Sequence, residues 1–213
     1  LPKTVNAVMN DGSKCAVDVQ WNVSDGDLEK MYAGGVAKYT VTGDAGGMTA
    51  TCYVSMVEYN FLDNYSFESG DLTGWSLQET GKADELYVEN KPSDSLTGSY
   101  HMHFWSAAQN SVEFSLEQTA HDIASGKYKF TVSIMGGDAG KTDIYAYVKL
   151  DGEIISRAPM TITSYNEWDT AVIPEIVYAE GQTLTVGVYV KCEGAGNGAW
   201  GKIDDALLNS VAD

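Results

Sequence analysis

Tryptophans near the ends of strand-like segments are the side chains of this sequence best suited to binding a ligand. Trp105 ends the alternating run at residues 101–105, and Trp200 follows the glycine-rich segment at residues 193–199. An aromatic ring beside a loop can stack on the apolar C–H face of a sugar. The residue types therefore indicate a saccharide-binding role for Trp105 and Trp200, with packing in a protein core as the alternative.

Acidic residues at the two ends of the longer alternating segment could hold a cation. Asp204 and Asp205 are neighbours in the last run, where successive side chains point to opposite faces, so they cannot flank one glycosidic bond together. One of them must point inward, and a buried carboxylate needs a charge partner. Because the first and last strands of a β-sandwich are commonly adjacent, Glu68 and Asp205 can converge on Ca²⁺, which binds carboxylate and carbonyl oxygens. Hydrogen-bonded or water-exposed acids are the alternative.

The histidines and cysteines offer weaker signals. His101 and His103 share one face of a strand, but a third metal ligand is not evident in the sequence, and an ordinary polar pair is favoured. Cys15 and Cys52 lie in two strand-like runs, and the sequence leaves open whether they form a disulfide. Cys192 is expected to be a buried thiol. The sequence contains no Cys/His cluster with zinc-ligand spacing.

The charge of the chain excludes several classes of partner. Thirteen Lys+Arg against 30 Asp+Glu give a formal net charge of −17, which repels nucleic acid and anionic membranes. No run approaches the ~18 apolar residues of a membrane-spanning helix, so no membrane insertion is expected. With 44% hydrophobic and 20% charged residues, the composition is that of a globular protein. The opening Leu1-Pro2-Lys3 is expected to be a cut inside a longer protein.

Alternation with a period of two residues predicts strands along nearly the whole sequence. In the first 58 residues we expect strands at 5–9, 15–21, 37–42 and 48–57, a turn at Gly43–Gly47 and one short helical turn within 24–33. The remaining sequence carries strand-like runs near residues 84–89, 99–106, 111–118, 126–135, 143–150, 153–162, 169–173, 182–191 and 200–208. Turn residues separate most of these runs, as in a jelly-roll β-sandwich. The prediction is an all-β chain with two domains, 1–58 and 59–213.

Residues 1–57 resemble the bacterial Ig-like domains of family 4, which are often spacers in secreted and surface enzymes. The matching segments are Leu1-Pro2-Lys3-Thr4-Val5, Asp11-Gly12-Ser13, Val17-Asp18-Val19-Gln20-Trp21 and Tyr39-Thr40-Val41-Thr42-Gly43. The resemblance implies a small Ig-like sandwich in which these segments are structural. Cys15 and Cys52 are not part of the family pattern.

Residues 60–213 are similar to jelly-roll carbohydrate-binding modules, most of all to the galactan-binding family 61 attached to bacterial endo-β-1,4-galactanases of glycoside hydrolase family 53. The matching segments are Asn64-Tyr65-Ser66-Phe67-Glu68-Ser69-Gly70-Asp71-Leu72-Thr73-Gly74-Trp75, His103-Phe104-Trp105-Ser106 and Trp200-Gly201-Lys202-Ile203-Asp204-Asp205. The resemblance implies a structural Ca²⁺ at Glu68 and Asp205 and a core position for Trp75. It implies polysaccharide binding without cleavage, for which the candidate residues are Trp105, Trp200, Trp168, Tyr145 and Asn197.

One function and two rivals follow from these observations. The expected chain is all-β, a small Ig-like sandwich followed by a jelly-roll β-sandwich, and it binds β-1,4-galactan without catalytic residues of its own. Its expected setting is a secreted galactanase, outside or on the surface of a bacterium, with the catalytic module in the same parent chain. The rivals are a jelly-roll enzyme that cuts a glycan with paired acids and a surface adhesion or structural module with a protein partner.

Overall fold

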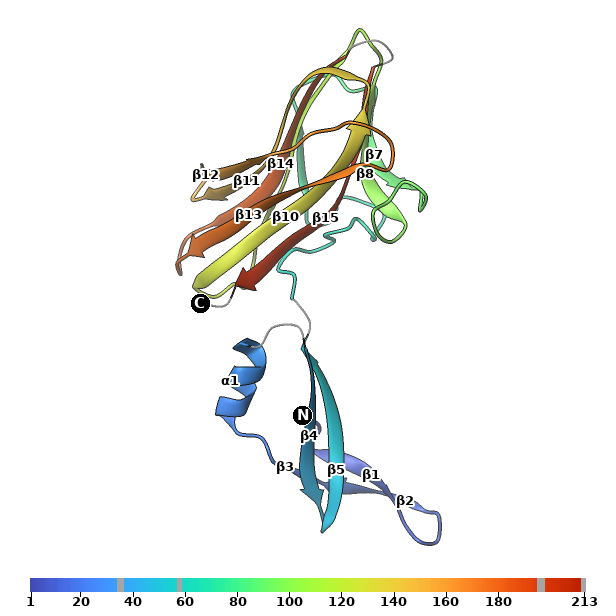
Figure 1. Cartoon of the computed structure of the whole chain (residues 1–213), viewed down its shortest axis with the longest axis vertical. Coiled ribbons are helices and arrows are strands. Elements are labelled where there is room, and N and C mark those ends of the chain that lie inside the picture. The colour runs from blue at the N-terminus through green and yellow to red at the C-terminus, as the bar shows by residue number, and fades with distance from the viewer. Residues whose placement is uncertain (34–36, 57–58, 195–197, 212–213) are drawn as a thin grey trace. The chain divides into compact units, whose positions relative to one another are not determined.

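The chain divides into two units, Leu1–Glu58 and Tyr59–Val211. The computed structural model describes residues 1–213 except 34–36, 57–58, 195–197 and 212–213. Strands dominate both units, which confirms the all-β class predicted from the alternation (Figure 1). Among the described residues, no helix has the length and apolar character that crossing a bilayer requires.

Unit 1 contains two small sheets and one helix. Its elements in chain order are β1 (Thr4–Val8), β2 (Lys14–Asp18), β3 (Gln20–Trp21), α1 (Asp25–Ala33), β4 (Ala37–Ala45) and β5 (Met48–Met56). Strands β1 and β2 pair with each other, and the second sheet has the order β3-β4-β5. Helix α1 begins with a reciprocal cap, because Ser24 Oγ accepts from Asp27 N at 3.2 Å and Asp27 Oδ2 accepts from Ser24 N at 3.0 Å.

The turn between β4 and β5 is shorter than the sequence predicts. The predicted turn at Gly43–Gly47 begins too early, because β4 continues to Ala45 and only Gly46 and Gly47 connect the strands. Both connecting glycines have positive φ angles, +66° and +84°, which glycine adopts without steric cost. Gly43 lies within the sheet instead, where a Cβ atom would stand 2.7 Å from a backbone oxygen of β3. It therefore permits a close approach of strands.

The three cysteines are free thiols. Cys15 is exposed on β2 and Cys52 is half-buried on β5, so the two lie in different sheets of unit 1. The disulfide that the sequence left open is therefore not formed. Cys192 is buried in unit 2, as predicted, and burial raises the pKa of its thiol to about 12.

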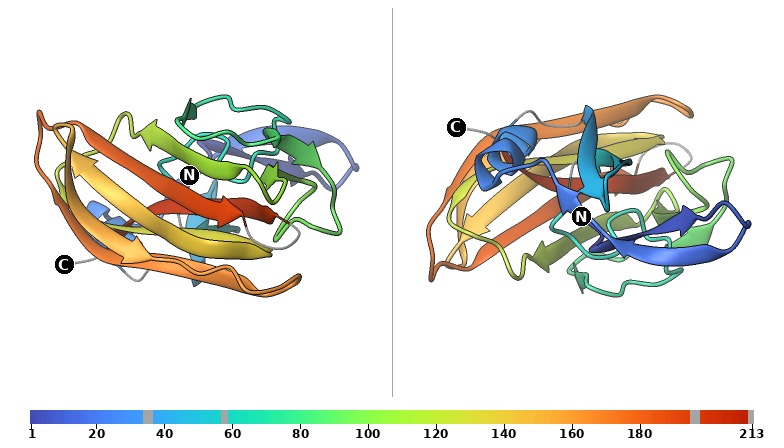
Figure 2. Two further views of the ribbon diagram at one scale, coloured as in Figure 1. Left: turned by 90° about the horizontal axis from the view of Figure 1, so that it is seen from above. Right: turned by 90° about the horizontal axis from the view of Figure 1, so that it is seen from below.

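Unit 2 is a sandwich of two five-stranded antiparallel sheets (Figure 1, Figure 2). Its strands are β6 (Ser76–Glu79), β7 (Glu85–Asn90), β8 (Tyr100–Ser106), β9 (Ser111–Thr119), β10 (Gly126–Gly137), β11 (Ala139–Leu150), β12 (Glu153–Pro159), β13 (Trp168–Tyr178), β14 (Leu184–Gly194) and β15 (Ala199–Val211). The β15 sheet has the order β13-β10-β15-β8-β7, and the β14 sheet has the order β12-β11-β14-β9-β6. Each run predicted between residues 84 and 208 corresponds to one strand from β7 to β15.

Apolar side chains from both sheets meet in the core of unit 2. Met102 and Phe104 of β8 are fully buried against Phe114 of β9, and the Phe104 and Phe114 ring centroids are 5.6 Å apart. Trp75 belongs to the same core, as the sequence predicts. Burial of such side chains contributes about 1.5–3 kcal/mol each. Because successive side chains of a strand point to opposite faces, the outer face of each sheet carries the side chains that are not in this core.

Candidate functional site

One row of side chains crosses the outer face of the β15 sheet. On β8, core-facing residues alternate with His103 and Trp105, which face outward. The register places Lys202 opposite His103 and Trp200 opposite Trp105. Across all five strands, the row through His103 consists of Trp168, Met135, Lys202, His103 and Tyr87. Strand pairing thus gathers the predicted residues Trp105, Trp200 and Trp168 on one face.

A groove of about 500 Å³ opens on this face beside Trp200. The groove is lined by Lys91, Ser93, Asp94, His103, Tyr165, Trp200 and Lys202. Residues 91–94 come from the β7–β8 loop and Tyr165 comes from the β12–β13 loop. The Tyr165 hydroxyl lies 3.1 Å from Ser93 O and 3.3 Å from Asp94 Oδ1, and donates to this pair of acceptors. The two loops are therefore tied together, and the groove combines aromatic rings with hydrogen-bonding side chains.

Trp200 is held in place by its neighbours. Its indole Nε1 donates to Asp138 Oδ2 at 2.9 Å. Gly137 lies beside the ring, where a Cβ atom would stand 3.3 Å from an indole carbon. Trp200 is half-buried and lines the groove. Trp105 and Trp168 are also half-buried, but they lie outside the groove lining.

Lys202 lies at the bottom of the groove among charged side chains. Its side chain is only 5% exposed, and its Nζ donates to Glu89 and to His103 Nδ1, the latter at 2.6 Å. Because an ammonium group can only donate, His103 Nδ1 accepts and carries no proton. The proton of neutral His103 is then on Nε2, which donates to Glu85 Oε2 at 3.0 Å. Burial lowers the pKa of His103, and the charge of Lys202 lowers it further.

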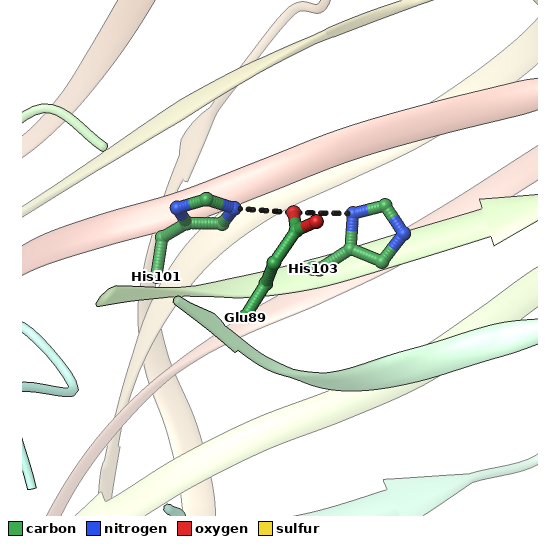
Figure 3. Close-up of side chains that lie close together, drawn as sticks. All are labelled: Glu89, His101 and His103. Atoms are coloured by element: carbon green, nitrogen blue, oxygen red, sulfur yellow. Dashed lines mark hydrogen bonds and ion pairs between the residues drawn. The ribbon is translucent and has the colours of Figure 1, made fainter. Parts of the chain in front are cut away.

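Glu89, which accepts from Lys202, also contacts a second histidine. Figure 3 shows its carboxylate between the imidazoles of His101 and His103. His101 Nε2 lies 3.0 Å from Glu89 Oε2, and His101 Nδ1 lies 2.9 Å from Ser95 Oγ. Burial opposes the ionisation of Glu89, but hydrogen bonds from Lys202 and His101 outweigh burial and lower the pKa of the carboxyl. Burial lowers the pKa of His101 as well. At neutral pH the cluster therefore contains one ion pair and two neutral imidazoles.

The cluster has the residue types of a metal site, but the ammonium group of Lys202 is already bonded to two of its members. Atoms of Glu89, His101 and His103 that could bind a metal lie within 4.8 Å of one another, so Glu89 supplies the third group that the sequence did not reveal. The ammonium group of Lys202 already bonds Glu89 and His103. A divalent cation would meet this buried positive charge at hydrogen-bond distance, which is strongly unfavourable. We therefore interpret the arrangement as an ion-pair cluster.

The two predicted calcium ligands meet one loop. Glu68 Oε1 accepts from Ser99 N and Tyr100 N, each at 2.8 Å. Asp205 Oδ1 accepts from Thr97 Oγ1 at 2.7 Å. Both carboxylates therefore lie against residues 97–100, at the end of the β7–β8 loop and the start of β8. Carboxylate oxygens are the donors that Ca²⁺ prefers, so the donor chemistry fits this ion.

Asp204 is the inward-pointing member of the acidic pair. It is fully buried, and its carboxylate accepts from Ser66 Oγ, Leu96 N, Thr97 N and Asp205 N at 2.8–3.3 Å. Burial and the neighbouring charge of Asp205 raise its pKa to about 6. Among the residues that the structure describes, no salt bridge reaches Asp204, Asp205 or Glu68. In the described part of the chain, these three carboxylates therefore have no cationic side chain as an ion-pair partner.

One predicted binding residue, Tyr145, lies on a different face from the groove. Tyr145 lies on the outer face of the β14 sheet, where its ring centroid is 5.0 Å from that of Tyr189. The guanidinium carbon of Arg157 lies 4.5 Å from the Tyr145 centroid. Asn197 lies outside the described residues. The four described members of the predicted set therefore span two faces of unit 2, and the three tryptophans share one of them.

Sequence reasoning missed several residues of this site, among them Lys202, Glu89 and Tyr165. Lys202 alternates with Trp200 on β15, so the period of two could have placed it on the same face. Glu89 reaches the cluster only because β7 pairs with β8. Tyr165 reaches the groove from a loop between two different sheets. No local pattern marks the last two residues.

Comparisons with known proteins agree with this architecture. Residues 1–47 match the model of a family described as bacterial Ig-like domain, group 4. No curated protein matches the chain in sequence. The family 61 carbohydrate-binding module TmCBM61, solved in complex with β-1,4-galactotriose, superposes with a TM-score of 0.61 at 25% identity, over 72% of this chain and 99% of that one. The predicted resemblances of the two parts of the chain are therefore confirmed.

Other solved structures share the fold alone. The enzymatically active domain of bacteriophage CBA120 tailspike protein 4 has a TM-score of 0.53 at 11% identity, over 74% of this chain and 23% of that one. A cyclase from Fischerella sp. TAU has a TM-score of 0.51 at 15% identity, over 71% of this chain and 96% of that one. Unit 2 therefore has the fold of a carbohydrate-binding module, and this fold also occurs in other proteins.

Proposed function

We propose that unit 2 binds β-1,4-galactan in the groove and leaves its glycosidic bonds intact. The groove itself carries the proposal, because Trp200 and Tyr165 accompany hydrogen-bonding side chains on one exposed face. Its volume of about 500 Å³ lies within the ~300–1,000 Å³ usual for small-ligand sites. The likeness to TmCBM61, whose structure contains β-1,4-galactotriose, supports galactan as the ligand.

The charges in the groove favour a neutral polysaccharide. Lys91 Nζ lies 2.9 Å from Asp94 Oδ2, and Lys202 is paired with Glu89. Each lysine of the groove therefore already has a carboxylate partner. The net charge of −17 also opposes the approach of an acidic glycan. Galactan carries no charge, so it needs no unpaired lysine in the groove and is not repelled by the negative net charge.

Recognition would combine stacking with hydrogen bonds to hydroxyl groups. The exposed part of Trp200 offers an apolar face to a pyranose ring, while Asp94 and Lys202 offer an acceptor and a donor. Galactose differs from glucose in its axial O4. In a β-1,4-linked chain this oxygen forms the glycosidic bond in every residue except the non-reducing end. Selection for galactan would therefore come from groups placed for the shape of the axially linked chain and from a partner for the terminal O4 hydroxyl. Trp105 and Trp168 share the face of the groove and would contact further residues of a longer chain.

We also propose that Glu68 and Asp205 hold a structural Ca²⁺ beside the β7–β8 loop. The ion would supply the positive charge that this acidic region lacks, and it would join the first and last segments of unit 2. Binding to the folded state alone stabilises a protein by mass action. The same loop provides residues 91–94 of the groove, so the ion would also steady the groove wall.

Removal of calcium is expected to lower the melting temperature of unit 2. EDTA should shift the calorimetric transition down by several degrees, because ~2.7 kcal/mol is lost when an ion present at 100 times its Kd is removed. The variant Glu68→Gln should start from the lower temperature and respond less to EDTA. An identical transition with and without EDTA would count against the ion.

The wider setting follows from the two units together. We propose that the chain belongs to a secreted bacterial galactanase whose catalytic module lies elsewhere in the same parent protein. Unit 1, with its Ig-like match, would act as a spacer. Unit 2 would hold the enzyme near its polysaccharide and raise the effective concentration of substrate.

Affinity electrophoresis on a panel of polysaccharides tests the proposed function. We expect the chain to be retarded in gels that contain galactan, and less in gels with arabinogalactan, xylan or β-glucan. Incubation with galacto-oligosaccharides should release no shorter products. Retardation in xylan gels alone would show that the ligand is xylan and not galactan. Hydrolysis of the oligosaccharides would show that the chain is catalytic.

A further inference from the structure

We propose that His103 makes glycan binding sensitive to pH, because its protonation displaces Lys202 from the bottom of the groove and weakens binding in acid. This inference rests on the proposed function and adds the regulation of the same site. It depends on one contact, the hydrogen bond of 2.6 Å from Lys202 Nζ to His103 Nδ1.

The contact exists only while His103 is neutral. Nδ1 must keep its lone pair to accept from the ammonium group, and Nε2 uses its proton on Glu85. A proton added to Nδ1 would place two positively charged donors at hydrogen-bond distance. Like charges at this distance in a partly buried site repel strongly. Protonation therefore requires Lys202 to leave or the imidazole to turn.

The surrounding charges decide which group moves. The neighbours of His103 are Lys202 on β15, His101 on its own strand, and Glu85, Tyr87 and Glu89 on β7. Asp94 of the β7–β8 loop lies behind Lys202, whose Nζ is 3.9 Å from the Asp94 carboxylate. Glu85 and Glu89 lie 3.0 and 3.5 Å from the two imidazole nitrogens, so they can hold the protonated ring. Lys202 Nζ then no longer donates to Glu89, and the ammonium group moves toward the groove and Asp94.

The sign of the pH dependence follows from this geometry. Burial and Lys202 keep the pKa of His103 below the ordinary ~6.5, so the ring is neutral at pH 7 and above. Binding that needs Lys202 in place is therefore complete above that range and is lost as pH falls through the pKa of His103. His101 provides an internal comparison, because its nitrogens bond Glu89 and Ser95 without a direct contact to a cation.

Calorimetric titration with β-1,4-galactotriose at constant ionic strength tests the proposal. The wild-type Kd is expected to rise at least about threefold as pH is lowered from 7.5 through the pKa of His103, which burial and Lys202 keep below its ordinary value. In His103→Gln this ratio should fall close to one, whatever the absolute affinity of the variant. The matched variant His121→Gln replaces an exposed histidine outside the groove and should keep the wild-type ratio.

A second measurement needs neither a variant nor the sugar. Nitrogen-15 NMR of the imidazoles should show His103 as the Nε2–H tautomer at pH 7.5, with Lys202 resonances moving as His103 titrates. A wild-type ratio of one, the same ratio in His103→Gln as in the wild type, or an Nδ1–H tautomer would each overturn the inference. Absence of binding at every pH would instead overturn the proposed function, and the NMR titration would still decide whether protonation of His103 displaces Lys202.

Discussion

Replacing Trp200 by alanine is expected to weaken galactan binding by about tenfold or more. An aromatic contact contributes about 0.5–1.5 kcal/mol beyond the burial of its area, and 1.4 kcal/mol corresponds to about tenfold in Kd. The substitution also removes the hydrogen bond from the indole to Asp138, which fixes the ring. Affinity electrophoresis on galactan and calorimetry with β-1,4-galactotriose would measure the loss.

The fold should survive this substitution, because Trp200 is half-buried and does not belong to the core of unit 2. Tyr53→Ala is a suitable control, since Tyr53 is an aromatic residue of unit 1 that is 81% exposed. Trp105→Ala should also weaken binding, with a smaller effect because Trp105 does not line the groove. If both tryptophan variants bound normally and Tyr145→Ala did not, the binding face would be that of the β14 sheet.

Replacing Asp204 by alanine is expected to destabilise unit 2 by about 3 kcal/mol or more, since each buried donor left without a partner costs about 1–3 kcal/mol. The carboxylate accepts from Ser66, Leu96, Thr97 and Asp205, which join the opening segment, the β7–β8 loop and the last strand. Its removal leaves the Leu96 and Thr97 amides without this acceptor. Urea unfolding followed by tryptophan fluorescence would measure the change.

Two milder variants separate the possible causes of this loss. Ser66→Ala removes one donor and leaves the acceptor, so we expect a cost of about 1 kcal/mol. Asp204→Asn keeps one acceptor oxygen and should fall between the two alanine variants. Equal stability of Asp204→Ala and the wild type would show that the buried carboxylate does not hold these segments together.

The positions of the strands could be predicted from the sequence because a strand is a local pattern. Inward apolar residues recur every second position, and turn residues interrupt the series, so the predicted run 111–118 corresponds to β9 at Ser111–Thr119. The prediction failed at Gly43, because glycine is needed both in turns and where backbones approach closely. Local sequence does not distinguish these two uses.

The chemistry of the site needed the tertiary structure. Trp105 and Trp200 were found from their residue type and their position beside loops, but only the register shows that they lie opposite each other. Lys202 is 99 residues from His103 and 113 residues from Glu89 along the chain. Such contacts are set by which strands pair and in which register, and that choice depends on the packing of the whole core. The sequence by itself therefore determined most of the strands, the fold class and the aromatic candidates, whereas non-local strand pairing decided which polar groups surround them.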